Sequence, residues 1–377
     1  MDLQQCRSLF PVTKSYIYLN HAANSPEPEP VKGAMQEYLA AASSMGTMME
    51  EEWKPKISKV RENAARLLGC SQDNIAFVPN VSSAVNLVAG GLDWQMGDNV
   101  VVTSDQFPAN VYPWLFLQRL GVEIRFAAWQ EQGFLDSIRS LLNNKTKVVA
   151  VSWVEFFSGR RHRLAELGIL CKKLGIILVV DAIQGLGALP FSLAEVHADV
   201  VAVGGHKWLM GPSGQGVAYF SPPVLDKLHP AAFSWRSIED YMNFDTYHLE
   251  LKPGAQRFEG GTPNWGGIYS LGASIDLILR LGSQAIATQI KLLSTHLMEA
   301  LRELPVEVLT PSAWSDRAGI VTFRPQGIRA QDLRQALLAR NIVVSARRDA
   351  LRASVHFYNT LAEVDKFIGH LKEILNP

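Results

Sequence analysis

Short apolar runs recur through the first 220 residues of this 377-residue chain. Residues 176–180 and 200–203 are apolar at every position, which is typical of strands buried on both faces of a sheet. Helical stretches such as 164–174 lie between these runs, and a repeated strand–helix–strand order predicts a mostly parallel sheet with helices on both faces. About seven strands are expected, at residues 75–78, 99–103, 123–127, 147–152, 176–180, 200–203 and 217–220.

Composition excludes several classes of protein. The chain has 36 basic and 36 acidic residues, so it has no general attraction to nucleic acid or to anionic membranes. No apolar run approaches the roughly 18–20 residues of a membrane helix, and residues 1–16 do not read as a secretory signal. Three cysteines without paired spacing, Cys6, Cys70 and Cys171, favour a reducing, cytoplasmic location. The histidines are scattered, so no metal site is expected.

Two of the expected strands end in residues that are typical of a catalytic or binding site. Asp181 ends the run 176–180, and Lys207 follows the run 200–203 after two glycines. The carboxyl ends of parallel strands are where open α/β sheets build their sites. A buried lysine there has a lowered pKa and can attack carbonyl groups, although a lone loop lysine is usually only solvated. A buried carboxylate needs a partner, which could be an arginine, a helix N-terminus or a protonated ring nitrogen.

The pair Asp181 and Lys207 matches the parts that a pyridoxal phosphate enzyme needs, since the lysine forms a Schiff base and the carboxylate keeps the pyridine nitrogen protonated. The stretch 181–220, DAIQGLGALPFSLAEVHADVVAVGGHKWLMGPSGQGVAYF, resembles the core of the class V aminotransferase family, which has fold type I. The similarity extends from YLNHAANSP at Tyr18 to LRASVHFYNT at Leu351. This family includes cysteine desulfurases, selenocysteine lyases, cystine C–S lyases and isopenicillin N epimerase-like proteins.

The resemblance implies an α/β fold of the type I pyridoxal phosphate-dependent transferases. A large cofactor-binding domain is expected over residues 21–259. Residues 1–20 and 260–377 are expected to form a smaller α+β domain. The family further implies a homodimer that binds pyridoxal 5′-phosphate and a small amino-acid substrate.

The resemblance also implies roles around the cofactor ring. Lys207 carries the Schiff base and moves the α-proton, Asp181 holds the pyridine nitrogen protonated, and Gln184 hydrogen-bonds the ring hydroxyl. Phe107 stacks on the ring where desulfurases have a histidine, and a phenyl ring can stack but cannot exchange a proton. Trp153 falls where desulfurases have an asparagine, which is a second departure from their pattern.

Four residues are implied to hold the cofactor phosphate. Val81 offers a backbone N–H and Ser82 a hydroxyl at the turn after residues 75–78, and a helix expected at 84–89 follows. A helix N-terminus is a ready anion site, although Ser or Asn before a helix is often only a cap. His206 and the partner subunit's Thr262 complete the set. The Thr262 segment also fits a plain Gly-Pro turn.

Substrate contacts are expected from three residues. Arg352 lies in a predicted strand, and its planar fork suits the α-carboxylate, although an ion pair with an acid of its own domain is the alternative. His21 and Asn24 lie in an N-terminal loop that covers the active site in the family. The sequence leaves open which of Arg347 and Arg348 faces the site.

The reaction is the least constrained prediction. In desulfurases a loop between the small-domain strands holds a nucleophilic cysteine, and residues 345–351 have none. Because persulfide chemistry needs a thiol at the site, the sequence predicts an amino-acid enzyme other than a cysteine-nucleophile desulfurase. Transamination, epimerisation and β-elimination such as C–S cleavage stay open, as does the role of residues 229–258. The segments SWVEFFSG, GGHKW and HFYNT look nearest to the epimerase-like and C–S lyase branches. A non-catalytic cofactor-binding module is a further alternative.

Overall fold

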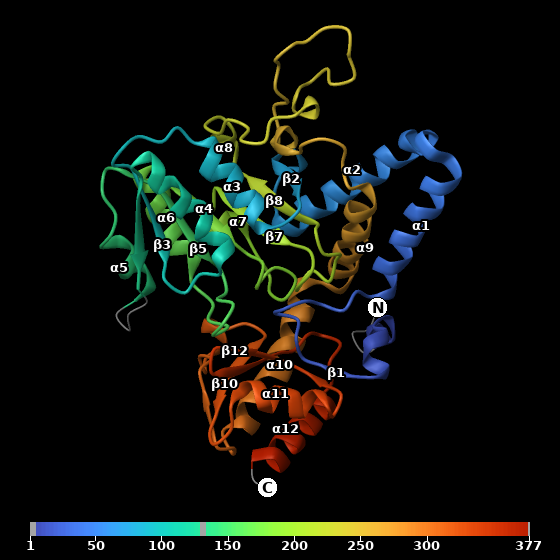
Figure 1. Ribbon diagram of the computed structural model, residues 1–377, viewed down its shortest axis with the longest axis vertical. Coiled ribbons are helices and arrows are strands. Elements are labelled where there is room, and N and C mark those ends of the chain that lie inside the picture. Colours follow the sequence, from blue (N-terminus) through green and yellow to red (C-terminus); the bar gives the residue numbers. More distant parts are fainter. Residues whose placement is uncertain (1–4, 129–132, 376–377) are drawn as a thin grey trace.

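The structure is a computed structural model that describes residues 5–128 and 133–375. A seven-stranded sheet with the order β2-β8-β7-β6-β5-β3-β4 forms its centre (Figure 1). Strands β3 to β7 run parallel, and β8 pairs antiparallel with both β7 and β2. This confirms the expected α/β fold. The strands are β2 (Ile75–Val78), β3 (Asn99–Thr103), β4 (Glu123–Ala127), β5 (Thr146–Ser152), β6 (Ile177–Asp181), β7 (Val200–Gly204) and β8 (Gly216–Phe220).

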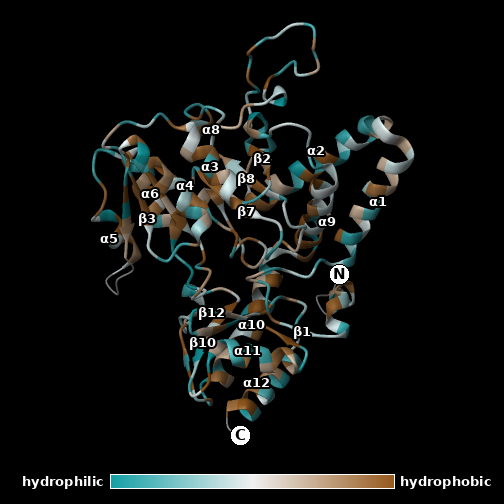
Figure 2. Cartoon of the chain, in the orientation of Figure 1, coloured by the Kyte–Doolittle hydropathy of each residue, from teal (hydrophilic) through white to brown (hydrophobic). Residues whose placement is uncertain are grey.

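Both faces of this sheet are covered, which explains why its central strands are apolar at every position. Successive side chains of β6 enter different cores, with Leu178 and Val180 in one and Ile177 and Val179 in the other. Helices α3 (Val81–Gly91), α4 (Tyr112–Leu115) and α8 (Pro222–Leu225) pack on one face. Helices α2 (Glu50–Leu68), α6 (Leu164–Leu174) and α7 (Leu193–Val196) contribute to the other core. Figure 2 shows hydrophobic residues along the labelled strands between these helices.

The C-terminal part lies below the large sheet in Figure 1. Its four-stranded antiparallel sheet has the order β12-β13-β10-β9. The N-terminal strand β1 (Ile17–Tyr18) pairs in parallel with β11 (Ile342–Val343), so the start of the chain joins this part. The proposed division between residues 259 and 260 stays a prediction. The other elements are β9 (Val306–Val308), β10 (Ile320–Pro325), β12 (Ser345–Arg347), β13 (Ala350–Ser354), α9 (Trp265–Leu281), α10 (Ser283–Leu301), α11 (Ala330–Leu338) and α12 (Leu361–Leu375).

The two remaining α-helices of the described residues are α1 (Glu29–Met45) and α5 (Phe134–Arg139). Between α8 and α9 the chain forms a long loop that projects above the large sheet in Figure 1. Its tip is open to solvent, and Tyr247 is 99% exposed. Among the described helices, none combines the length and apolar character needed to cross a bilayer. The cytoplasmic location stays a prediction.

Candidate functional site

A pocket with about 720 Å³ of empty space, part of it open to solvent, lies at the carboxyl ends of β6 and β7. It collects residues from the large sheet, the N-terminal loop and the β12–β13 hairpin. Its walls are formed by Ala22, Ala23, Asn80, Val81, Ser82, Phe107, Ala109, Phe156, Asp181, Ile183, Gln184, His206, Lys207, Arg347 and Arg352.

Asp181 and Lys207 meet in this pocket because their strands are neighbours in the sheet. Asp181 is 2% exposed and accepts a hydrogen bond from the backbone N–H of Ile183 at 2.9 Å. Burial raises the Asp181 pKa to about 6, against the effects of that hydrogen bond and of the Lys207 charge. Burial lowers the pKa of Lys207, which is 7% exposed, to about 8, although the Asp181 charge opposes this shift. The Lys207 amine is therefore partly neutral near pH 8 and can act as a nucleophile.

The side-chain amide of Gln184 is held in one orientation. Its Oε1 accepts a hydrogen bond from the Trp208 indole at 2.9 Å, and its Nε2 donates to the Ala22 carbonyl at 3.0 Å. Because an indole nitrogen can only donate, the amide cannot flip, and one N–H of Nε2 is left for a ligand. Trp208 directly follows Lys207 in the sequence, but no local sequence pattern predicts this supporting role.

The turn before α3 forms another wall of the pocket. Asn80 is the N-cap, and its side chain accepts a hydrogen bond from the Ser83 backbone at 2.9 Å. Helix α3 therefore begins at Val81, three residues earlier than the sequence predicts, because Asn80 supplies the cap. Val81 and Ser82 lie in the first helical turn, where unpaired backbone N–H groups favour an anion. His206 lines the same pocket, so this wall has the donors that a phosphate group requires.

An apolar wall stands beside Lys207. The Lys207 ammonium lies 5.3 Å from the centre of the Phe107 ring, and Phe156 packs edge-on against Phe107. Phe107 is 42% exposed, and it lines the pocket. A partly exposed ring at this place suits stacking against a flat heteroaromatic group. Phe156 belongs to the segment SWVEFFSG, and its contact with Phe107 is not predictable from the sequence pattern.

Arg352 lies on β13 and is 2% exposed. One Nη donates to the Phe156 carbonyl at 2.5 Å, whereas the buried Nε has no hydrogen-bond partner. Burial lowers the Arg352 pKa to about 9, and the Arg347 charge adds to this shift. Because leaving a buried charged donor unpaired is costly, the vacant Nε and the cationic environment fit an anionic ligand such as a carboxylate.

Three predicted site residues are not brought into this pocket. His21 is fully buried, and its Nε2 lies 2.8 Å from the Tyr358 hydroxyl, so its imidazole points into the core. Asn24 also lies outside the pocket walls, and the loop instead presents Ala22 and Ala23. Neither His21 nor Asn24 lines this pocket within one chain, so their expected substrate contacts stay a prediction.

Thr262 lies in a different hollow from Lys207. That hollow runs along the segment from Phe258 to Asn264 and has about 1240 Å³ of empty space, part of it open to solvent. Thr262 is not among the residues that line the Lys207 pocket within one chain, although Ser83, the neighbour of Ser82, lines the Thr262 hollow.

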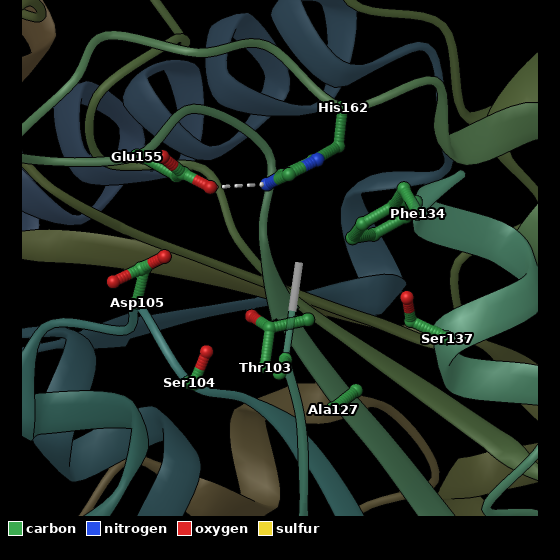
Figure 3. A pocket seen from close by; sticks show the side chains of 9 residues that line it. Thr103, Ser104, Asp105, Ala127, Phe134, Ser137, Glu155 and His162 are labelled. Atoms are coloured by element: carbon green, nitrogen blue, oxygen red, sulfur yellow. Dashed lines mark hydrogen bonds and ion pairs between the residues drawn. The ribbon is translucent and has the colours of Figure 1, made fainter. Parts of the chain in front are cut away.

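Figure 3 shows another pocket, between the ends of β3 and β4 and helix α5. His162 lies 3.0 Å from a Glu155 carboxylate oxygen, and the Phe134 ring stacks on the His162 imidazole. Asp105 stands across the pocket from them. With about 240 Å³ of empty space this pocket is much smaller than the one at Lys207, and its histidine already has a partner. The Lys207 pocket is therefore the candidate active site.

The family model described as Aminotransferase class-V matches residues 17–367. The chain belongs to the class V aminotransferase family. It is thus a pyridoxal phosphate-dependent enzyme with the type I fold, as its sequence predicts.

A probable cysteine desulfurase of Pyrococcus abyssi is 33% identical, with coverage of 99% of this chain and 97% of the relative. The apo structure of a cysteine desulfurase from Thermococcus onnurineus NA1 is 32% identical with a TM-score of 0.90, and the match covers 98% and 97% of the two chains. A mutant of C-DES with glycine covalently linked to its PLP cofactor is 24% identical with a TM-score of 0.91, covering 97% and 98%, and shows the same fold.

These relatives overturn the expectation that the enzyme is not a cysteine desulfurase. That expectation depended on the absence of a cysteine from residues 345–351 and therefore assumed that the acceptor thiol must lie there. Cleavage of a carbon–sulfur bond and capture of the sulfur are separate chemical steps, and an acceptor thiol is needed only for the second. The full-length similarity to named desulfurases carries more weight than one loop position.

The lowered pKa of Lys207 can be tested by competitive acetylation of the apoprotein, followed by mass spectrometry. We expect the acetylation rate of Lys207 to rise through a midpoint near pH 8, because only the neutral amine reacts and burial lowers its pKa to about 8. Ordinary surface lysines titrate near about 10.4 and serve as internal references. In Asp181→Asn the midpoint should move lower, since the opposing negative charge is gone. A Lys207 rate that still climbs beyond pH 10 would contradict this prediction.

Proposed function

We propose that this enzyme cleaves the carbon–sulfur bond of L-cysteine and is a cysteine desulfurase. The observation that carries the proposal is the joint placement of Lys207, Asp181 and Arg352 in one pocket of a chain that resembles desulfurases over its full length. A nucleophilic amine, a buried carboxylate and a carboxylate anchor are the parts that amino-acid chemistry on this cofactor needs.

The pocket offers a place for each part of the cofactor. Pyridoxal phosphate, when bound, supplies an aldehyde that captures amines and a ring that withdraws electrons from the α-carbon. We assign the aldehyde to Lys207, the ring nitrogen to Asp181 and the ring hydroxyl to the free N–H of Gln184. Phe107 covers the face of the ring.

The cofactor phosphate is assigned to the first turn of α3. Its ligands there are the Val81 N–H and the Ser82 hydroxyl, together with His206. The helix N-terminus adds a partial positive charge that favours this anion.

The substrate is oriented by its α-carboxylate, which binds the guanidinium of Arg352. This contact satisfies the unpaired Nε and fixes the direction of the α-carbon relative to Lys207. Lys207 then removes the α-proton, because its lowered pKa allows the amine to act as a base near pH 8. The carbon–sulfur bond breaks, the sulfur passes to an acceptor thiol, and the β-carbon gains a proton. L-cysteine and one thiol thus give alanine and one persulfide.

A second candidate is β-elimination, in which L-cysteine and water give sulfide, pyruvate and ammonia. The observation that favours it is the composition of the pocket wall, which includes no cysteine among the residues that line the pocket. Both reactions use the same residues to bind the substrate, and they differ in the carbon product.

The products formed from L-cysteine decide between these reactions. With the purified holoenzyme and a thiol such as dithiothreitol, we expect alanine and sulfide in equal amounts, measured by chromatography and a sulfide assay. Pyruvate with ammonia would identify the elimination reaction. Lys207→Ala should lose at least about a thousandfold in kcat/KM, since it removes both the covalent anchor and the base. Rapid transamination or racemisation of L-cysteine without sulfide would contradict both candidates.

We also propose that the active form is a homodimer with shared sites. Thr262 does not line the Lys207 pocket within one chain, and its hollow reaches the first turn of α3 at Ser83. The neighbouring loop carries Trp235, Phe244 and Tyr247, all exposed, and its Ser234 hydroxyl accepts a hydrogen bond from Gly261 N–H at 3.0 Å. These exposed aromatic side chains are suited to burial against a second copy, which would bring Thr262 to the partner's phosphate site.

Subunit mixing tests this arrangement. Lys207→Ala and Thr262→Asp chains are each expected to be inactive, the second because its carboxylate repels the phosphate. After verified exchange of equal amounts, about a quarter of the wild-type activity should return, since half of the dimers are mixed and each has one intact site. No recovery would mean that Thr262 and Lys207 of the same chain serve one site, or that Thr262 does not contact the cofactor.

A further inference from the structure

The chain leaves β5 through a tight turn, residues 154–161, which we call the β5 turn. Its two limbs are hydrogen-bonded to each other at Glu155. The Glu155 N–H donates to the Arg160 carbonyl at 2.8 Å, and the Gly159 N–H donates to the Glu155 carbonyl at 3.1 Å. Phe156, which lines the active-site pocket, is the next residue and begins the tip of the turn.

The tip of the β5 turn is bonded to the C-terminal part of the chain. Each of the backbone carbonyls from residue 156 to residue 159 accepts a hydrogen bond from that part. In this order the donors are an Nη of Arg352, the hydroxyls of Thr322 and Thr310, and the N–H of Ala318. Of these donors, Arg352 is the one that lines the active-site pocket. The Phe156 carbonyl is therefore the point at which this set of bonds reaches the site.

The bond to Phe156 decides how the Arg352 guanidinium can bind a substrate. Its Nη1 donates to the Phe156 carbonyl at 2.5 Å, and its buried Nε has no hydrogen-bond partner among the described residues. A guanidinium binds a carboxylate through two parallel N–H groups on one edge of its plane. With Nη1 engaged, the edge left for an α-carboxylate is the one that carries Nε and Nη2. The Phe156 carbonyl thus sets the orientation of the proposed carboxylate anchor.

The side chain of Glu155 closes the β5 turn from within. Glu155 is 7% exposed, and one of its carboxylate oxygens lies 3.0 Å from Nε2 of His162, whose ring is stacked on Phe134 (Figure 3). The other oxygen accepts a hydrogen bond from the Ser158 hydroxyl. Glu155 therefore fixes the limb that leads into Phe156, whereas the C-terminal part of the chain holds the residues after it.

We propose that Glu155 is a positioning residue that sets, through the Phe156 carbonyl, the edge of Arg352 offered to the substrate's α-carboxylate. Glu155 does not itself line the Lys207 pocket, so its effect on a substrate must pass through Phe156. Loss of its two side-chain contacts would let the Phe156 carbonyl shift, and the Arg352 plane would turn with it. The inference rests on the proposed function, in which Arg352 binds the α-carboxylate.

The test uses two amines that differ only in the carboxylate, L-alanine and ethylamine. Each is titrated into the holoenzyme, and Kd is measured from the change in cofactor absorbance. In Glu155→Met, which keeps the length of the side chain but removes both acceptor oxygens, Kd for L-alanine should rise about tenfold or more, as expected when a charge-assisted hydrogen bond is weakened. Kd for ethylamine should stay within about twofold of wild type, because ethylamine makes no use of Arg352.

Two variants separate positioning from a general loss of stability. Glu155→Gln should bind both amines as wild type does, because an amide can accept from His162 and donate to the Ser158 oxygen. Glu363→Met is the matched control. Glu363 is also 7% exposed, and it accepts hydrogen bonds from Arg7 and Asn359. This variant removes an equally buried carboxylate elsewhere, so it should lower Tm and leave the ratio of the two Kd values unchanged.

Several results would overturn the inference. These are an unchanged Kd for L-alanine in Glu155→Met, an equal rise for both amines, or a Glu155→Gln variant as impaired as Glu155→Met. If Glu155→Met does not fold, Ser158→Ala decides instead, since it removes one of the two contacts of the carboxylate. It should give a smaller rise in Kd, again for L-alanine only, and no selective rise would reject the role of Glu155.

A failure of the proposed function is distinguishable from a failure of this inference, because the titration requires no turnover. If L-cysteine gave no alanine but Glu155→Met still lost affinity for L-alanine alone, the desulfurase proposal would fall and the role of Glu155 would stand. If Arg352→Ala left the Kd of L-alanine unchanged, the carboxylate anchor would be wrong, and the inference on Glu155 would fall with it.

Discussion

The buried pair of Lys207 and Asp181 is the interaction on which the site depends. Each group alone would be costly to place at the end of a buried strand. Burial raises the pKa of Asp181 and lowers that of Lys207, while each charge offsets part of the shift of the other. The result is an amine that is reactive near neutral pH beside a carboxylate that is ready to hold a protonated ring nitrogen. The pairing of β6 with β7 sets this proximity.

The remaining structure keeps this pair in place. Two hydrophobic cores pack against the sheet, one on each face, and they fix the positions of the strands that carry the pair. Trp208 holds the amide of Gln184, and the Asn80 cap starts α3 where the first turn faces the same pocket. The β12–β13 hairpin brings Arg352 and Arg347 from the C-terminal part, and the pocket is complete only when both parts of the chain are folded.

Much of this arrangement could be predicted from the sequence because it depends on local patterns. Continuous apolar runs identify strands buried on both faces, and parallel order places Asp181 near Lys207 without any knowledge of loops. Strand alternation also placed Arg352 correctly on a strand. Residues whose orientation depends on distant contacts were harder to place. His21 turns inward because Tyr358, more than 300 residues away, accepts or donates its hydrogen bond, and the choice between Arg347 and Arg348 required the hairpin register. The prediction that excluded a desulfurase was wrong. It relied on the absence of a cysteine from residues 345–351, whereas the similarity to named desulfurases covers nearly the whole chain.

The measurement that tests this account most directly is the position of the covalent bond to the cofactor. The holoenzyme, reduced with borohydride and digested, should give a single pyridoxyl-labelled peptide, and mass spectrometry should place the label on Lys207. The same treatment of Lys207→Ala should give no labelled peptide. A label on a different lysine, or one spread over several lysines, would contradict the assignment of the active site to the ends of β6 and β7.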